Sequence, residues 1–300
     1  MGEAITLEKT PVSDEERWNL LQIKAQEARA VRAIKLFREN ETEPILIKGV
    51  AASAFYPKGE LRACIDVDLA VSGEDYQGAL QLVRSKAADG FAIDLHNELR
   101  HLDTVHWIDL FKNSRELYLE DYPVRILRPE DHLRVLIVHW LTDGGTDRQR
   151  LWDIYYAVDN RPPDFDWDRL LNLVSANRRR WIVCTLGLAH KFLGLDLEDT
   201  PVSREALDLP AWLVKTVERE WASDVRNEPL EMTLKDRSRF ITQVRRRFRP
   251  DPIWATVQME GSFDARTRFF YRVANFVKRI PSSYRRVITT IKLNRNEHKA

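Results

Sequence analysis

The sequence predicts an α+β protein in two parts, a mixed β-sheet domain flanked by helices over residues 1–128 and an all-helical domain over residues 129–300. Two observations support this division. Apolar and alternating segments typical of strands occur only in the first part, whereas helical spacing of apolar residues continues through the second. The run Arg128-Pro129-Glu130-Asp131 also places a proline and two acids in a first helical turn, which marks the start of the helical domain.

The first domain is predicted to begin with a helix and a short strand. Ser13, with Glu16 three residues later, fits a capping box, and apolar residues then recur at helical spacing to about Asn40. After a polar turn, the apolar run 45–47 predicts a buried strand that ends at Lys48-Gly49. The helix is therefore expected to pack against the sheet to which this strand belongs.

A short helix at residues 50–55 is followed by a predicted strand over residues 62–71, which carries two acids. Side chains alternate between the two faces of a strand, so Asp66 and Asp68 are expected to share one face. Ile65 and the apolar residues at the next odd-numbered positions are expected to share the other face. Two neighbouring carboxylates repel each other unless a positive charge lies between them, and Mg²⁺ is a common partner of such pairs.

The rest of the first domain is predicted to add a helix and two more strands. A helix is expected at about residues 74–88, and the alternating segment 91–99 predicts a half-buried strand with Asp94 on its polar face. Residues 107–119 are expected to be helical or irregular, and residues 123–127 to form a short strand that completes the sheet. The helices predicted for the second domain span about residues 133–141, 150–158, 167–176, 180–193 and 209–223.

The motifs of the first domain resemble those of the nucleotidyltransferase superfamily. The matching pattern is Lys-Gly, then Arg, then Asp-x-Asp, then Asp-Leu-His, formed here by Lys48-Gly49, Arg62, Asp66-Val67-Asp68 and Asp94-Leu95-His96. It is similar in particular to the branch of uncharacterised nucleotidyltransferases, in which Lys-Gly stands where better-known members carry Gly-Ser. The resemblance covers roughly residues 14–160. It implies transfer of a nucleoside monophosphate from a nucleoside triphosphate to an acceptor hydroxyl, with Mg²⁺ or Mn²⁺ as cofactor and release of pyrophosphate.

On this resemblance, Asp66, Asp68 and Asp94 are expected to be the catalytic and metal-binding acids. Three carboxylates can hold two Mg²⁺ ions about 3.5–4 Å apart, one activating the nucleophile and one stabilising the leaving phosphates. Asp94 is expected to hold the second metal or to act as a base toward the acceptor hydroxyl. The alternative third carboxylate is Asp109, in the segment Trp-Ile-Asp-Leu.

The nucleotide-binding residues implied by the resemblance are Lys48, Gly49 and Arg62. Glycine allows the backbone to approach a phosphate closely, and the lysine ammonium can contact the triphosphate as a point charge. A simpler interpretation of Lys48-Gly49 is a strand-ending lysine with a glycine cap. Arg62 has even spacing from both aspartates of its predicted strand, so it is expected either to bind phosphate or to neutralise the acids.

Two further residues are expected to support the site. His96 follows Asp94 by two residues and shares its face, so it can position the acceptor or donate to Asp94, although a lone strand histidine is also common as a structural residue. Asp153 lies in the second predicted helix of the helical domain, where it is expected either to close the site or to pair with an arginine.

The composition argues against several classes of protein but does not indicate which acceptor is used. The net charge of +1 gives no whole-protein attraction to nucleic acid, and the two cysteines, Cys64 and Cys184, indicate no disulfide framework and favour a reducing cytoplasm. No apolar stretch reaches the ~20 residues of a transmembrane segment. The acceptor is expected to be a small molecule, with tRNA or a protein as alternatives, and the base of the nucleotide and the oligomeric state are left open.

Two other functions remain compatible with these motifs. One is a non-catalytic relative that binds a nucleotide as a scaffold or sensor. The other is a toxin-like transferase acting on tRNA or a protein, for which a basic C-terminal surface would be the docking site.

The C-terminal segment is basic and amphipathic. Residues 266–300 contain ten Lys or Arg and one Glu, and the apolar residues of its predicted helix are Phe269, Phe270, Val273, Phe276, Val277 and Ile280. This apolar face is expected to pack on the helical domain, with an anionic membrane surface or RNA as alternatives. The basic runs 178–180 and 245–247 are interpreted as solvated helix ends.

Overall fold

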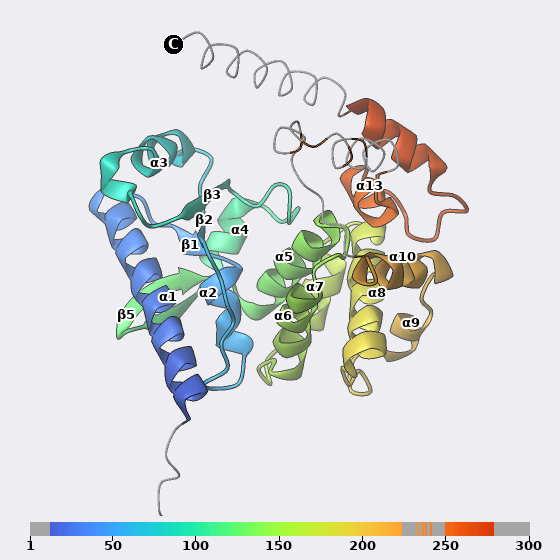
Figure 1. Cartoon of the computed structure of the whole chain (residues 1–300), viewed down its shortest axis with the longest axis horizontal. Coiled ribbons are helices and arrows are strands. Elements are labelled where there is room, and N and C mark those ends of the chain that lie inside the picture. Colours follow the sequence, from blue (N-terminus) through green and yellow to red (C-terminus); the bar gives the residue numbers. More distant parts are fainter. Residues whose placement is uncertain are drawn as a thin grey trace, which may run out of the picture. The chain divides into compact units, whose positions relative to one another are not determined.

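The computed structural model of the chain describes residues 13–223 and 250–278, together with Thr233, Asp236, Ser238 and Ile241. The chain divides into two compact units (Figure 1). Unit 1 contains the described residues up to His132 together with Asn160–Phe165, and unit 2 contains Leu133–Asp159 and the described residues from Asp166 onward. All strands that the structure describes belong to unit 1.

Unit 1 is built on a mixed five-stranded sheet with the order β3-β2-β1-β5-β4. The strands are β1 (Ile45–Leu46), β2 (Val67–Val71), β3 (Ile93–Asn97), β4 (Arg115–Leu119) and β5 (Tyr122–Ile126). The pairs β2–β3 and β1–β5 are parallel, whereas β1–β2 and β4–β5 are antiparallel. A mixed sheet with flanking helices, followed by a helical region, confirms the predicted α+β class.

Helix α1 (Asp14–Glu39) covers one face of this sheet (Figure 1). It begins with the predicted capping box, since the Ser13 hydroxyl accepts from the backbone N–H of Glu16 and the Glu16 carboxylate accepts from that of Ser13. The buried residues of α1 and of the sheet form one apolar core, which includes Ile34, Phe37, Val67, Leu69 and Val71. Because side chains alternate along a strand, the residues between these core positions face away from α1.

The predicted strand over residues 62–71 is wrong in its first half, since β2 begins only at Val67. The neighbouring strand β1 is two residues long and pairs with Leu69 and Ala70, so residues 62–66 have no sheet partner. Ile65 is exposed rather than part of the apolar face, and its carbonyl accepts from the Arg29 guanidinium. The expected alternation therefore holds within β2 and not before it.

The segment 107–119, expected to be helical or irregular, contains both a helix and a strand. Helix α4 (Trp107–Lys112) is followed by β4, which forms a hairpin with β5. The two residues of the hairpin loop, Glu120 and Asp121, both have positive φ, as a type I′ turn requires. This turn usually carries Asn or Gly, so the sequence gives no clear hairpin signal here. The other short helical segments of unit 1 are α2 (Gly49–Ala52), Ser53–Phe55, α3 (Tyr76–Val83) and Lys86–Ala88.

All the regular secondary structure that the structure describes in unit 2 is helical. Its helices include α5 (Pro129–Thr142, which begins in unit 1), α6 (Arg148–Asp159), α7 (Trp167–Asn172), α8 (Ala176–Leu193), α9 (Ser203–Leu207), α10 (Ala211–Trp221) and α13 (Pro252–Gln258). Trp140 and Trp181 are fully buried, and their indole N–H groups donate to the carbonyls of Asp147 and Gly261. None of the described helices combines the length and the apolar composition that a transmembrane helix needs.

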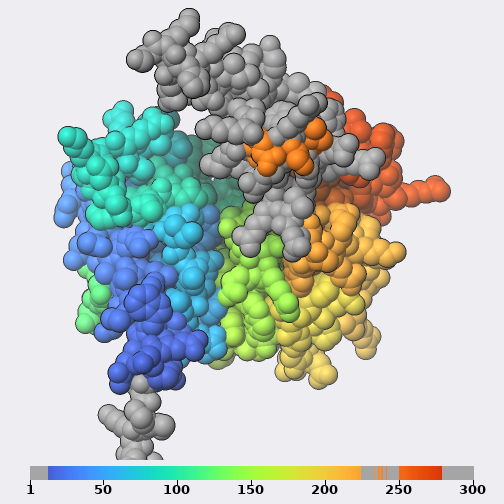
Figure 2. Space-filling view, in the orientation of Figure 1, coloured from blue at the N-terminus to red at the C-terminus, as the bar shows by residue number. Residues whose placement is uncertain are grey.

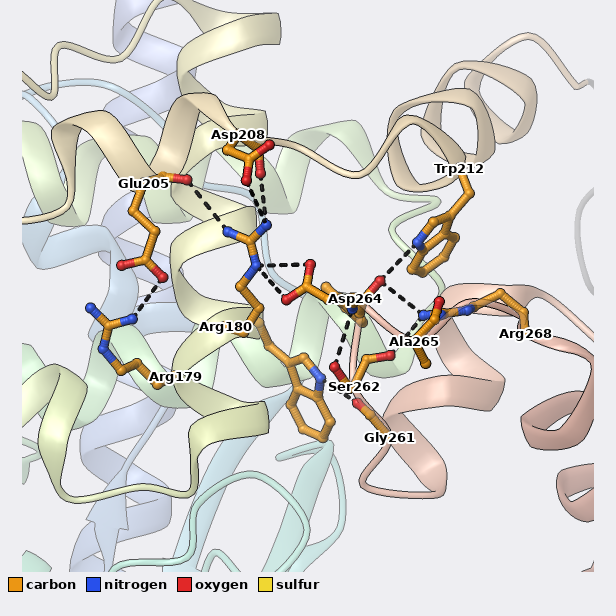
Figure 3. A network of polar contacts seen from close by, with 12 residues as sticks. Arg179, Arg180, Glu205, Asp208, Trp212, Gly261, Ser262, Asp264, Ala265 and Arg268 are labelled. Atoms are coloured by element: carbon orange, nitrogen blue, oxygen red, sulfur yellow. Dashed lines mark hydrogen bonds and ion pairs between the residues drawn. The ribbon is translucent and has the colours of Figure 1, made fainter.

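The basic run 178–180, at the start of α8, forms ion pairs rather than a solvated helix end. Arg178 is buried and pairs with Glu260 at 2.6 Å, and Figure 3 shows Arg179 paired with Glu205 and Arg180 with Asp264. The interpretation of this run as a solvated helix end is therefore wrong, because each cation faces an acid from a later segment. The second run, residues 245–247, lies outside the described residues.

Asp251, which caps α13, is expected to make the stability of the protein depend on pH. Its Oδ1 accepts from the backbone N–H of Trp254, but its Oδ2 is buried without a hydrogen-bond partner. Burial, reinforced by Glu220, raises the pKa of Asp251 to about 7, above the 3.8 of a free aspartate. The folded state therefore binds the proton more tightly, and the free energy of unfolding should fall by a few kcal/mol as pH rises from about 4 to about 7.

The Asp251→Asn variant is the matched control for this prediction, because asparagine keeps the capping oxygen and does not titrate. Denaturant unfolding at several pH values should show a flatter profile for the variant, with the largest gain in stability at the alkaline end. Parallel profiles for the two proteins would contradict the assignment.

Candidate functional site

The site begins at the turn that follows β1. Lys48 has φ 48° and ψ −141°, a backbone conformation that residues other than glycine rarely adopt, and Gly49 follows with φ 21°. A Cβ atom at Gly49 would lie 3.3 Å from Oδ2 of Asp68 and 3.6 Å from the Asp66 carbonyl oxygen. Glycine therefore lets the turn pass close to β2, and the turn directs the Lys48 side chain to the acids of the sheet.

Asp68 and Asp94 are direct neighbours on the parallel strands β2 and β3, where they pair in register. They project from the sheet face opposite α1, because the residues on either side of them belong to the core under α1. Lys48 lies between them, with its Nζ 2.5 Å from Oδ1 of Asp68 and 3.6 Å from Oδ2 of Asp94. The side chains of Lys48 and Asp68 are each 6% exposed, and that of Asp94 is 48% exposed.

His96 completes this group from the next outward position of β3. Its Nε2 lies 3.1 Å from Oδ2 of Asp94 and 3.6 Å from Oδ1 of Asp68. Burial alone would lower the pKa of His96, but its contacts with Asp68 and Asp94 outweigh burial and raise the pKa. When His96 is protonated, the positive charges of Lys48 and His96 balance the negative charges of Asp68 and Asp94 in a largely buried cluster.

The pKa of Asp94 lies well below its usual range. The main cause is the hydrogen bond with His96, which outweighs the opposing effect of burial, and the charge of Lys48 contributes further. Asp94 is therefore a carboxylate with weak affinity for protons and with half of its side chain open to solvent.

His132, which the sequence did not single out, fixes the turn that carries Lys48. The backbone N–H of Lys48 donates to Nε2 of His132 over 3.1 Å, and the ring of Phe55 packs against the imidazole at 5.4 Å between centroids. Complete burial, with help from the nearby charge of Arg62, lowers the pKa of His132 to about 3. The imidazole is therefore neutral, and since Nε2 accepts, its proton is on Nδ1.

The other predicted site residues lie outside this cluster. Asp66 is exposed and lies one residue before β2, and Arg62 is half-buried, with its guanidinium near enough to influence His132. Asp109, the alternative to Asp94, is exposed on α4. Asp153 is buried in α6 of unit 2, and its role at the site stays a prediction.

The donor set of the cluster fits a divalent metal ion. Among the described residues, Asp68, Asp94 and His96 offer ligand atoms that all lie within 4.8 Å of one another. Carboxylate oxygens suit Mg²⁺ and Mn²⁺, and an imidazole ligand favours Mn²⁺ of the two. Because Lys48 contacts both carboxylates, a metal ion and the ammonium group would compete for the same oxygens.

Comparison with models of known protein families gives a match. The family model described as uncharacterised nucleotidyltransferase matches residues 12–194, which include all of the cluster and His132. The chain belongs to this family. No curated protein and no solved structure matches the chain. Membership confirms the resemblance drawn from the Lys-Gly, Asp-x-Asp and Asp-Leu-His motifs, and it supports nucleotidyl transfer as the general activity of this nucleotidyltransferase.

Proposed function

We propose that the protein transfers a nucleoside monophosphate from a nucleoside triphosphate to an acceptor hydroxyl and releases pyrophosphate. The observation that supports this most directly is the in-register pair of Asp68 and Asp94, held together by Lys48 and His96. We propose cytoplasmic action on a small-molecule acceptor, with Mg²⁺ or Mn²⁺ as cofactor. Fold alone would not support this activity, because one fold can host many functions.

Asp68 and Asp94 would hold the metal ion, with Asp66 as a further ligand from the exposed segment before β2. A bound ion would supply positive charge to the triphosphate and lower the pKa of the attacking hydroxyl. The reaction needs no covalent intermediate, since the chain has to place the acceptor hydroxyl in line with the leaving pyrophosphate and to stabilise the developing negative charge.

The lowered pKa of Asp94 favours a ligand role over a general-base role. A general base works best when its pKa is near the working pH, whereas Asp94 binds protons weakly because of His96 and Lys48. His96 in this account orients the Asp94 carboxylate and keeps it ionised. Lys48, once released from Asp68, would lie beside the triphosphate as a point charge.

A labelled-transfer assay tests the proposal. The protein is incubated with each α-labelled nucleoside triphosphate, with Mn²⁺ or Mg²⁺ and a cell extract, and the labelled product is identified. Label should appear on an acceptor with the wild-type protein and not with Asp94→Ala. Asp109→Ala is the matched control, because it removes an exposed acid of the same unit and should keep activity. Equal labelling by all three proteins would disprove the assignment.

The buried Lys48–Asp68 ion pair also favours a second candidate function, nucleotide binding without transfer. An ammonium group that already neutralises Asp68 could leave a site that binds phosphates but holds no catalytic metal. In that case the wild-type protein should bind a nucleoside triphosphate equally well with and without divalent ions, and no extract should yield a labelled acceptor.

His132→Leu is expected to weaken transfer because the variant cannot accept the Lys48 N–H. A buried donor left without its partner costs about 1–3 kcal/mol, and the strained turn should then relax and move Lys48 away from Asp68. We expect a loss of transfer on the order of 10- to 100-fold, mainly in the KM for the nucleotide. His132→Gln, which retains an acceptor oxygen, should recover part of the loss. A Leu variant with wild-type kinetics would show that the turn does not need His132.

A further inference from the structure

The last described helix, residues 269–278, has its polar side turned inward. Arg268, which directly precedes the helix, and Tyr271, Arg272 and Asn275 have the spacing i, i+3, i+4 and i+7 and define the inward stripe. Arg272 donates to the Pro250 carbonyl over 3.1 Å, and Asn275 is buried. A Cβ atom at Gly261 would lie within 2.6 Å of the Tyr271 ring, so the helix packs tightly at this point.

The loop before this helix fixes its orientation. Arg180 of α8 pairs with Asp264 at 2.9 Å. Figure 3 shows this pair and shows Arg268 directed to backbone oxygens of the same loop. The Arg268 guanidinium donates to the carbonyl oxygens of Ser262 and Phe263 and lies 4.7 Å from the ring centroid of Trp212. The indole of Trp212 in turn donates to the Phe263 carbonyl. These contacts hold the Arg268 side chain inward. Phe269 and Phe270, the next two residues, therefore lie on the outer side of the helix.

The opposite side of the helix is apolar and open to solvent. Its members are Phe269, 64% exposed, Phe270, 70% exposed, Val273, 44% exposed, and Val277, 58% exposed, which together define the outward stripe. The segment, shown in red, reaches the surface in Figure 2. A surface helix normally shows the reverse arrangement, with apolar residues inward and polar residues outward. The expectation that this face packs on the helical domain is therefore wrong for these four residues, whereas Phe276 is half-buried and Ile280 lies outside the described residues.

We propose that the outward stripe docks on an anionic lipid surface, with the helix lying in the plane of the headgroups. The exposed cations Arg266 and Lys278 flank the stripe at its two ends, and residues 266–300 contain ten Lys or Arg and only one Glu. Apolar side chains enter the boundary of the acyl chains while neighbouring cations reach the phosphates, which is the physical basis of interfacial helix binding. The basic composition selects membranes that contain anionic lipids.

Two other occupants fit the stripe less well. It offers on the order of 400 Å² of apolar side chain, about half of what one partner buries in a standard protein–protein interface. RNA recognition places cations where the phosphates run, whereas the centre of this stripe contains only Phe and Val and its cations lie at the ends. A lipid surface needs neither a complementary shape nor central cations.

Sedimentation of the full chain with lipid vesicles tests the proposal. The wild-type protein should bind phosphatidylcholine vesicles that contain phosphatidylglycerol and not those of phosphatidylcholine alone, and salt should weaken the binding. Phe269→Ser/Phe270→Ser should lower the bound fraction at least about tenfold. Trp18→Ser/Leu21→Ser is the matched control, because both residues are exposed and apolar in α1, and this variant should bind like the wild type.

Charge reversal by Arg266→Glu/Lys278→Glu gives an independent readout, including the case in which the double serine variant does not fold. This variant should lose most binding to the anionic vesicles. Equal vesicle binding by the wild type and the variants would overturn the proposal. It would also be overturned if the wild type bound no vesicles, whether or not it formed a dimer or bound RNA through the same residues.

Discussion

Asp68→Asn is expected to lower the rate of nucleotidyl transfer by about 1000-fold or more. The substitution keeps the shape of the side chain but removes the negative charge that pairs with Lys48 and that would hold the metal ion. Because Asp68 lies between Lys48 and His96 and directly beside Asp94, no other carboxylate among the described residues occupies an equivalent position. The measurement is the initial rate of product formation from an α-labelled nucleoside triphosphate.

Folding has to be measured in the same experiment, since the variant leaves the buried Lys48 ammonium with Asp94, 3.6 Å away, as its acidic neighbour among the described residues. Thermal unfolding should show a folded protein of reduced stability. Asp109→Asn changes an exposed acid of α4 in the same way and should retain the wild-type rate. Activity of Asp68→Asn within tenfold of the wild type would show that Asp68 is not a metal ligand.

Lys48→Met is expected to destabilise the protein by about 3–5 kcal/mol and to make its stability depend on divalent metal. Methionine retains most of the apolar length of lysine, but Asp68 then stays buried beside Asp94 without the ammonium group. A divalent cation can replace that charge. We therefore expect Mn²⁺ to bind the variant about 10- to 100-fold more tightly than it binds the wild type. Mn²⁺ should also raise the unfolding temperature of the variant more than that of the wild type.

Denaturant unfolding with and without Mn²⁺ measures both effects. The double variant Lys48→Met/Asp68→Asn is the control, because it removes both charges of the pair and should recover part of the lost stability while responding little to Mn²⁺. Equal responses of Lys48→Met and the wild type to Mn²⁺ would show that the ammonium group and the metal ion do not compete for the same carboxylate oxygens.

The sequence predicted the parts of the fold and the site that depend on local patterns. The capping box at Ser13 starts α1, and the alternation of β3 places Asp94 and His96 on one face. The strand prediction was wrong for residues 62–66 because a strand also needs a neighbouring strand to pair with, and β1 is too short to reach these residues. Periodicity reports only which face of a segment is apolar, and it contains no information on how far the neighbouring strand extends.

The rest of the site depends on contacts between residues far apart in the chain. The pairing of Asp68 with Asp94 follows from the register of two parallel strands, and the ion pair of Lys48 follows from an unusual backbone conformation. His132 is 84 residues from Lys48 and follows a run of acids that reads as an ordinary helix start. A histidine that accepts one backbone N–H leaves no sequence pattern, so only the structure could identify it.

The return of Asn160–Phe165 to unit 1 determines how the half of the chain that contains the cluster of Lys48, Asp68, Asp94 and His96 can be isolated. In this segment Asn160 donates to the Phe55 carbonyl and Asp164 pairs with Arg115, so it is an integral part of that half. A fragment that stops at residue 128 would lack both this segment and His132. Any expression clone intended to retain this cluster should therefore continue past residue 165, which brings α5 and α6 with it.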